Sequence, residues 1–248
     1  MRSKIVPISN ISRLADAASA LIHRAPGMPG MGLIEGPTGY GKTTAVTWLI
    51  VQLGAVYVRA QSMTTPKSLL ESICTELDVN PKPTNVGTVN VIVKALAESK
   101  RALFVDEADY LLGNKRLVET LRDIHDLSTM PVVLIGMQKF RSKISDLPQL
   151  SGRIAESVEF QAASFDDVTL LARHLLDVEV TPELLARLHE AALGSVRLTC
   201  IGLNKIEQIG RARGLAKVSA ADWPAGAEFF VGKAPAAPVK RGALSAVK

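Results

Sequence analysis

Short apolar runs alternate with segments of helical periodicity over the first two thirds of the chain. Five of these runs are bounded by turn residues and predict strands. They lie at about 31–36, 55–59, 102–107, 132–135 and 157–160. Apolar positions that recur every three or four residues predict helices at about 9–23, 42–53, 68–77, 88–99 and 117–128. Alternating strands and helices predict an α/β fold, with a five-stranded parallel sheet and helices on both faces.

After residue 160 the pattern becomes purely helical. Ser164 with Asp167 has the spacing of a capping box, Thr181 precedes a proline at a first helical position, and Gly194-Ser195 begins a third helix. Beyond Trp223 the chain is rich in Ala, Pro and Lys, which favours a flexible segment. We therefore expect an N-terminal helix and linker (1–25), an α/β domain (26–162), a small all-α lid (163–223) and a basic tail (224–248).

One glycine-rich turn lies between the first strand and the next helix. Residues 36–43 read Gly-Pro-Thr-Gly-Tyr-Gly-Lys-Thr, the spacing of a phosphate-binding loop. The glycines let backbone N–H groups point at a polyphosphate, the lysine brings a positive charge, and the last threonine brings a hydroxyl for Mg²⁺. The following helix directs the positive end of its dipole at the same anion. The sequence thus predicts ATP and Mg²⁺ binding, with ligands Gly36, Pro37, Thr38, Gly39, Tyr40, Gly41, Lys42, Thr43 and Thr44.

A second motif makes hydrolysis the expected chemistry. The apolar run at 102–105 ends in two acids, Asp106 and Glu107. A buried parallel strand delivers its last residues to the carboxyl edge of the sheet, where ligands bind. We expect Asp106, with Thr43, to hold Mg²⁺, and Glu107 to orient and polarise the attacking water.

Composition places the chain among globular proteins, since 47% of its 248 residues are hydrophobic and 21% are charged. Its first residues contain no long apolar segment, and no run of 18 apolar residues occurs, so we expect neither a secretory signal nor a membrane span. Cys74 and Cys200 lie far apart on apolar helical faces, which favours two buried thiols in a reducing compartment. A cytoplasmic protein is expected.

The net charge of +5 favours a polyanionic partner, but only mildly. From Pro224 onward, four basic residues stand against one acid, so the tail carries three of the five net charges. Any nucleic-acid surface on the folded part must therefore be a local patch. Charge alone does not identify the partner.

A phosphate-loop domain followed by a helical lid resembles the AAA+ ATPases. Leu150-Ser-Gly-Arg-Ile154 resembles the position of the AAA+ arginine finger, which implies that Arg153 reaches the γ-phosphate bound by a neighbouring subunit. Gly194-Ser-Val-Arg197 resembles the sensor 2 motif, which implies that Arg197 contacts the nucleotide of its own chain. The alternative for each is an ordinary surface arginine.

One position departs from the AAA+ pattern. The sensor 1 residue, a polar side chain in that family, would follow the strand at 132–135, and Met137 stands there with Gln138 beside it. Methionine cannot orient a water molecule by hydrogen bonding as a polar side chain does. Either Gln138 takes this role, or hydrolysis is slow and depends on a partner. We expect slow, partner-stimulated hydrolysis.

Within the AAA+ group, the chain resembles the target-selecting transposition ATPases, the family of the phage Mu B protein. The resemblance covers about residues 15–223. It rests on Asp106-Glu-Ala-Asp-Tyr-Leu111, on Gly-Arg-Ile at 152–154, and on Gly-Ser-Val-Arg-Leu at 194–198 with the basic helix after it. Secretion-associated ATPases share the first of these runs. The Mu protein also carries an amino-terminal helix-turn-helix domain for which this sequence has no room.

That resemblance implies a specific role. ATP-bound subunits would assemble as a helical filament around double-stranded DNA, in a bacterial host cytoplasm, and present this DNA to a DDE-type transposase. Contacts would be mostly to phosphates and therefore salt-sensitive. The expected DNA-binding residues are Lys67, Lys82, Lys115 and Arg116. A second basic cluster would contact DNA or the transposase, or be a solvated face: Lys205, Arg211, Arg213 and Lys217.

Two alternatives keep the ATPase but change its partner. A secretion-associated or general AAA+ ATPase would act on a protein, and a replication helicase loader would bind another ATPase. The absence of a membrane-spanning run in the sequence argues against secretion.

Overall fold

The computed structural model describes residues 1–2 and 4–231. They form two compact units, Pro7–Gln161 and a second that joins the first six residues to the chain from Ala162 onward. The N-terminal part expected at 1–25 is thus divided between the two. The backbone N–H of Arg2 donates to Leu175 O at 2.7 Å within the second unit, whereas the first helix belongs to the first unit.

The first unit is built on a five-stranded parallel sheet with the strand order β2-β3-β4-β1-β5. Its strands are β1 (Met31–Glu35), β2 (Val56–Arg59), β3 (Leu103–Asp106), β4 (Val132–Ile135) and β5 (Ile154–Glu159). The central strands β3 and β4 are buried along their whole length, as their continuous apolar runs predict. The edge strands β2 and β5 alternate between more and less buried positions.

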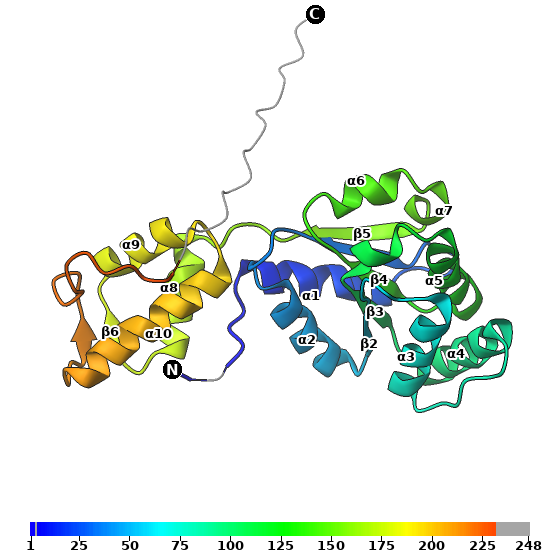
Figure 1. Cartoon of the computed structure of the whole chain (residues 1–248), viewed down its shortest axis with the longest axis horizontal. Coiled ribbons are helices and arrows are strands. Elements are labelled where there is room, and N and C mark those ends of the chain that lie inside the picture. Colours follow the sequence, from blue (N-terminus) through cyan, green and yellow to red (C-terminus); the bar gives the residue numbers. More distant parts are fainter. Residues whose placement is uncertain (3, 232–248) are drawn as a thin grey trace, which may run out of the picture. The chain divides into compact units, whose positions relative to one another are not determined.

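Helices cover both faces of this sheet (Figure 1). One face carries α1 (Ser9–Ile22) and α2 (Lys42–Leu53). The opposite face carries α3 (Pro66–Leu77), α4 (Asn85–Ser99), α5 (Lys115–Ser128), α6 (Phe140–Ser145) and α7 (Pro148–Ser151). The crossover from β1 to β2 and those from β2 to β3 and β4 run in opposite directions along the sheet. Right-handed crossovers therefore place their helices on opposite faces.

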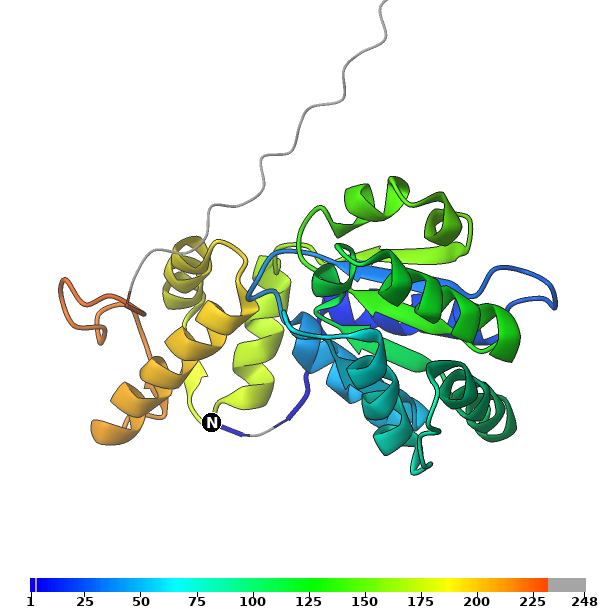
Figure 2. The ribbon, with the colours of Figure 1, turned by 45° about the vertical axis from the view of Figure 1, so that its right-hand side comes forward.

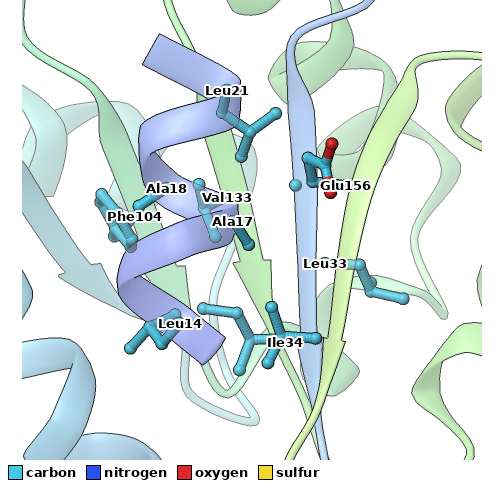
Figure 3. A pocket seen from close by; sticks show the side chains of 11 residues that line it. Leu14, Ala17, Ala18, Leu21, Leu33, Ile34, Phe104, Val133 and Glu156 are labelled. Carbon is cyan, nitrogen blue, oxygen red and sulfur yellow. The ribbon is translucent and has the colours of Figure 1, made fainter. Parts of the chain in front are cut away.

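A large apolar core lies between the sheet and helices α3, α4 and α5, which lie side by side in Figure 2. On the other face, α1 packs Leu14, Ala18 and Leu21 against the sheet and leaves a small gap (Figure 3). Gly32 permits this close approach, because a Cβ there would lie 2.6 Å from Leu21 Cδ1.

Some boundaries differ from the sequence prediction. Helix α4 begins at Asn85 rather than near residue 88, because the Thr84 side chain accepts a hydrogen bond from Gly87 N and caps the helix there. Strand β5 begins three residues before the predicted 157, where its edge position leaves half of the side chains exposed. The short helices α6 and α7 were not predicted.

The second unit contains α8 (Phe165–Leu175), α9 (Pro182–Ala192) and α10 (Val196–Ala212). Its predicted helix starts are confirmed, with a capping box at Ser164 and side-chain caps at Thr181 and Ser195. The pattern did not predict its pair of two-residue parallel strands, β6 (Glu179–Val180) and β7 (Lys217–Val218).

The expected basic tail falls only partly within the described residues. Up to residue 231 it folds back: Trp223 stacks on Phe229 with ring centroids 4.4 Å apart, and Trp223 Nε1 donates to Ala227 O at 2.9 Å. Residues 232–248 lie outside the part that the structure describes. Among the described helices, none has the length and apolar composition to cross a membrane.

Candidate active site

The loop between β1 and α2 has the backbone of a phosphate cradle. Gly36, Gly39 and Gly41 have φ values of 151°, 87° and 85°, which favour glycine. Steric contact also requires glycine at position 36, because a Cβ there would lie 2.8 Å from Phe160 Cβ and 2.9 Å from Phe160 O. The residue that follows β5 therefore lies directly against the loop and leaves no room for a side chain at Gly36.

The Lys42 side chain folds back over this loop. Its Nζ donates to Gly36 O at 2.6 Å and to Pro37 O at 3.0 Å. The ammonium group is therefore held where an anion in the loop would meet it. Tyr40 is buried, and this burial raises the pKa of its hydroxyl. Thr43 and Thr44 lie exposed in the first turn of α2.

Asp106 ends β3 as a buried carboxylate, only 4% exposed. Its Oδ1 accepts from the backbone N–H of Glu107 at 2.8 Å, and its Oδ2 accepts from the Tyr57 hydroxyl at 2.9 Å. Burial and this hydrogen bond raise the pKa of Tyr57, so its hydroxyl stays protonated and donates. Two residues earlier on β3, Phe104 faces α1 (Figure 3). Asp106 therefore faces the side of the sheet that carries α2 and its Thr43.

Glu107 follows in the left-handed region, with φ 53°, at the start of the 3₁₀ helix η1 (Ala108–Leu111). Its Oε1 lies 3.1 Å from Arg59 Nη2. Tyr57 and Arg59 thus hold the two acids, and sequence reasoning missed both. The sequence could have indicated them, because they stand two residues apart on β2 and residues at this spacing point to the same face of a strand.

Two carboxylates, one in η1 and one at the end of β1, hold the segment that follows β4. Asp109 in η1 accepts from Met137 N at 2.6 Å and pairs with Lys143 at 2.9 Å. Glu35 at the end of β1 accepts from Arg141 N at 2.9 Å. Met137 itself is exposed, as is Gln138 beside it. Met137, where the sequence departs from the AAA+ sensor 1 pattern, therefore lies at the sheet edge that carries the phosphate loop and the two acids.

Arg153, the arginine-finger candidate, is paired within its own chain. Its Nε lies 2.6 and 2.9 Å from the two carboxylate oxygens of Asp126 on α5. This hydrogen bonding lowers the pKa of Asp126 and raises that of Arg153. Arg153 O accepts from Met31 N, so the residue lies beside the start of β1, about 16 Å along this five-residue strand from the phosphate loop. Its role at a neighbouring subunit stays a prediction.

Arg197 belongs to the second unit, where it lies exposed in the first turn of α10. Its contact with nucleotide also stays a prediction.

The four expected DNA-binding residues are exposed and lie in the layer formed by α3, α4 and α5. Lys67 is in the first turn of α3, Lys115 and Arg116 begin α5, and Lys82 lies in the loop before α4. Lys67 pairs with Glu71 at 3.8 Å and Lys115 with Glu119 at 3.6 Å, which reduces the local positive potential. The structure brings all four into this layer.

The side chains present fit a Mg²⁺–nucleotide complex. Thr43 and Asp106 offer the oxygen ligands that Mg²⁺ prefers, with water and phosphate oxygens completing its shell. Among the described residues, no group of three or more His, Cys, Asp or Glu side chains could hold a metal ion by itself. This donor set suits a metal that arrives with a phosphate ligand.

Comparison with known proteins agrees with this geometry. Residues 27–144 match the family described as an AAA domain. No curated protein matches the sequence.

Solved structures share the fold at low identity. ORC2 of Aeropyrum pernix, in ADPNP and ADP complexes, has a TM-score of 0.70 and 16% identity, over 90% of this chain and 68% of that one. ORC1 of Aeropyrum pernix in complex with DNA has a TM-score of 0.61 and 18% identity, over 86% of this chain and 62% of that one. RuvB of Thermotoga maritima, a Holliday junction branch migration motor, has a TM-score of 0.60 and 18% identity, over 88% of this chain and 67% of that one. The chain therefore shares the AAA+ P-loop fold, a five-stranded parallel sheet with helices on both faces, followed by a helical C-terminal region, and residues 27–144 match the AAA domain family.

Proposed function

We propose that this chain is a Mg²⁺-dependent ATPase. One observation carries the proposal: the glycine loop with Lys42 and the acids Asp106 and Glu107 all lie where parallel strands of one sheet end. In open α/β sheets this edge binds ligands. Its combination of anion cradle, ammonium and paired acids suits phosphoryl transfer to water.

Each side chain has a distinct task in this reaction. Lys42 exchanges the carbonyls of Gly36 and Pro37 for phosphate oxygens when nucleotide binds. Thr43 and Asp106 hold Mg²⁺, which neutralises the phosphate charge when bound. Glu107 accepts a hydrogen bond from the attacking water and orients it. Arg153 of one subunit stabilises the charge that develops at the site of the next. Residue 137 is a methionine, which cannot orient the attacking water by hydrogen bonding as a polar side chain would. Hydrolysis is therefore slow without a partner.

Lys42→Ala tests the nucleotide site. Removing a charged donor costs about 1.5–3 kcal/mol per hydrogen bond, so ATP affinity should fall at least about 10-fold. Fluorescent ATP titration measures it, with Lys94→Ala as the matched control, because Lys94 is an exposed lysine on α4 paired with Glu98. Equal affinity of wild type and Lys42→Ala would refute the assignment of the phosphate loop.

We further propose that ATP-bound subunits polymerise on double-stranded DNA as a filament and deliver it to a transposase. Support comes from the resemblance of the 106–111, 152–154 and 194–198 segments to target-selecting transposition ATPases. The fold likeness to the DNA-bound ORC1 structure and to RuvB also favours a DNA substrate. Lys67, Lys82, Lys115 and Arg116 are the proposed contacts to phosphate.

Electron microscopy of negatively stained samples tests this assembly. The protein is imaged with and without random duplex DNA and with and without a slowly hydrolysed ATP analogue. Filaments that require both are the expected result. Particles or rings that form with nucleotide regardless of DNA would refute the DNA role and favour a protein partner, as for a secretion ATPase or a helicase loader.

Charge reversal tests the proposed contacts to DNA. Arg116→Glu should weaken DNA binding and flatten its dependence on salt, while Lys94→Glu on α4 makes the same charge change at a residue that is not one of the proposed contacts. ATP affinity should be equal in both variants. Equal DNA affinity of both would refute a role for Arg116.

A further inference from the structure

The edge strand β2 directs two alternate side chains at the two acids of the site. Tyr57 and Arg59 lie two residues apart and so share one face of β2. The strand register places Tyr57 beside Phe104 and Arg59 beside Asp106. The neighbours Val56 and Val58 point instead into the apolar core under α3 and α4. The face of β2 with Tyr57 and Arg59 therefore contacts the two acids, whereas the face with Val56 and Val58 packs in the apolar core.

We propose that Tyr57 is a positioning residue for the metal-binding carboxylate, its hydroxyl fixing Asp106 in the orientation that receives Mg²⁺. The proposal rests on the ATPase function argued above and assigns to that site a residue outside its sequence motifs. Tyr57 Oη donates to Asp106 Oδ2 at 2.9 Å.

The geometry leaves Asp106 little rotational freedom. Oδ1 is held by the N–H of Glu107 at 2.8 Å, and Oδ2 by Tyr57. Two donors on different oxygens fix the plane of the carboxylate. Each oxygen keeps a further lone pair, which is available to a metal ion or its water shell. Tyr57 thus orients the ligand without blocking it.

Burial makes the hydroxyl necessary rather than incidental. Asp106 is 4% exposed, and a buried carboxylate is stable only when donors compensate its lost hydration. Phenylalanine would fill nearly the same volume beside Phe104 but would offer no donor. The function of the hydroxyl is therefore separable from the packing of the ring.

Tyr57→Phe isolates that hydroxyl. The first readout is affinity for a fluorescent ATP analogue with and without Mg²⁺, and the second is Mn²⁺ binding to the protein–nucleotide complex by electron paramagnetic resonance. Loss of an outer-shell partner typically weakens metal affinity 10- to 100-fold. We expect about 10-fold weaker Mn²⁺ binding, with Mg²⁺-free nucleotide affinity equal to wild type. Tyr110→Phe is the matched control, because Tyr110 is an exposed tyrosine in η1.

A double-mutant cycle shows whether the hydroxyl acts through Asp106. In an Asp106→Asn background, Tyr57→Phe should have no further effect on Mn²⁺ binding. Unchanged Mn²⁺ affinity in the single variant, or an equal loss in both backgrounds, would overturn the proposal. Equal loss of nucleotide affinity with and without Mg²⁺ would also overturn it, because it would indicate general damage to the fold.

The same experiment separates this inference from the proposed function. If the wild-type chain binds no nucleotide, the ATPase proposal fails, and the role of Tyr57 fails with it. If the wild type binds nucleotide with Mg²⁺ and Tyr57→Phe binds both equally well, only the role of Tyr57 fails.

Discussion

Arg59 and Glu107 form an ion pair across the ends of two neighbouring strands, with Arg59 Nη2 3.1 Å from Glu107 Oε1. This hydrogen bond raises the pKa of Arg59. The carboxylate expected to polarise water is therefore engaged by a cation of its own chain. If Glu107 orients the attacking water as proposed, it must turn away from Arg59, so the ion pair would compete with catalysis.

Arg59→Ala should raise basal ATP hydrolysis. A surface ion pair contributes little, so the rise is limited to about 5-fold at most. The steady-state rate at saturating ATP measures it, with Arg187→Ala on α9 as the control for loss of an exposed arginine. A fall in rate would mean that Arg59 positions Glu107 productively instead.

Glu107→Gln should bind ATP and Mg²⁺ but turn over slowly. The amide keeps the size of the side chain but cannot accept a proton or carry the charge that polarises water, and a general base typically contributes about 10²–10⁴-fold. Single-turnover hydrolysis is the direct measurement, with nucleotide affinity determined in parallel. A rate within 2-fold of wild type would remove Glu107 from the reaction.

Arg153→Ala and Asp126→Ala should have opposite effects on turnover by assembled protein. If Arg153 acts at a neighbouring subunit, its loss suppresses turnover, whereas removing Asp126 releases the guanidinium and raises turnover. Both variants should bind ATP like wild type. The rate as a function of protein concentration tests this. Equal suppression by both variants would indicate that the pair only stabilises the sheet unit.

Sequence prediction succeeded where the information is local. The phosphate loop lies within eight residues, and the central strands are continuous apolar runs that need no partner to be recognised. Glycine spacing and apolar runs therefore located the tight loop after β1 and the strands around it, whereas the roles of the loop and the acids stay predictions.

Prediction failed for contacts that depend on strand register or on tertiary packing. Tyr57 reaches Asp106 only because β2 lies beside β3 in a register that brings its hydroxyl to that carboxylate. The partner of Arg153, Asp126, is 27 residues away and becomes its neighbour only through the packing of α5. The start of α4 was misplaced because Asn85 and Gly87 are poor helix formers, which the Thr84 cap offsets.

Gly36→Ala should destabilise the first unit and weaken ATP binding together. Its φ of 151° disfavours a side chain, and the added Cβ would overlap Phe160, whose backbone cannot move without shifting β5. A loss of about 1–3 kcal/mol in unfolding free energy is expected. Urea denaturation measures it against Gly113→Ala, where a Cβ meets nothing within 4 Å. Equal stability of the two variants would show that the loop relaxes around the methyl group.

The stability that Asp126 contributes through Arg153 should depend on pH in acid. Hydrogen bonding from Arg153 holds the pKa of Asp126 below its ordinary value of 3.8. A carboxyl whose pKa is lower in the folded state stabilises it above the unfolded pKa, and this contribution is lost as pH falls through the folded pKa.

The unfolding free energies of wild type and Arg153→Ala should therefore differ by a constant amount, up to about 1 kcal/mol from the pair, at neutral and mildly acidic pH. Below about pH 4 this difference should shrink, because protonation of Asp126 removes the charge that Arg153 binds. Urea titrations of both proteins between pH 3 and 7 measure it. A difference that persists unchanged at pH 3 would mean that packing of the arginine stem, rather than the ion pair, carries its stabilising effect.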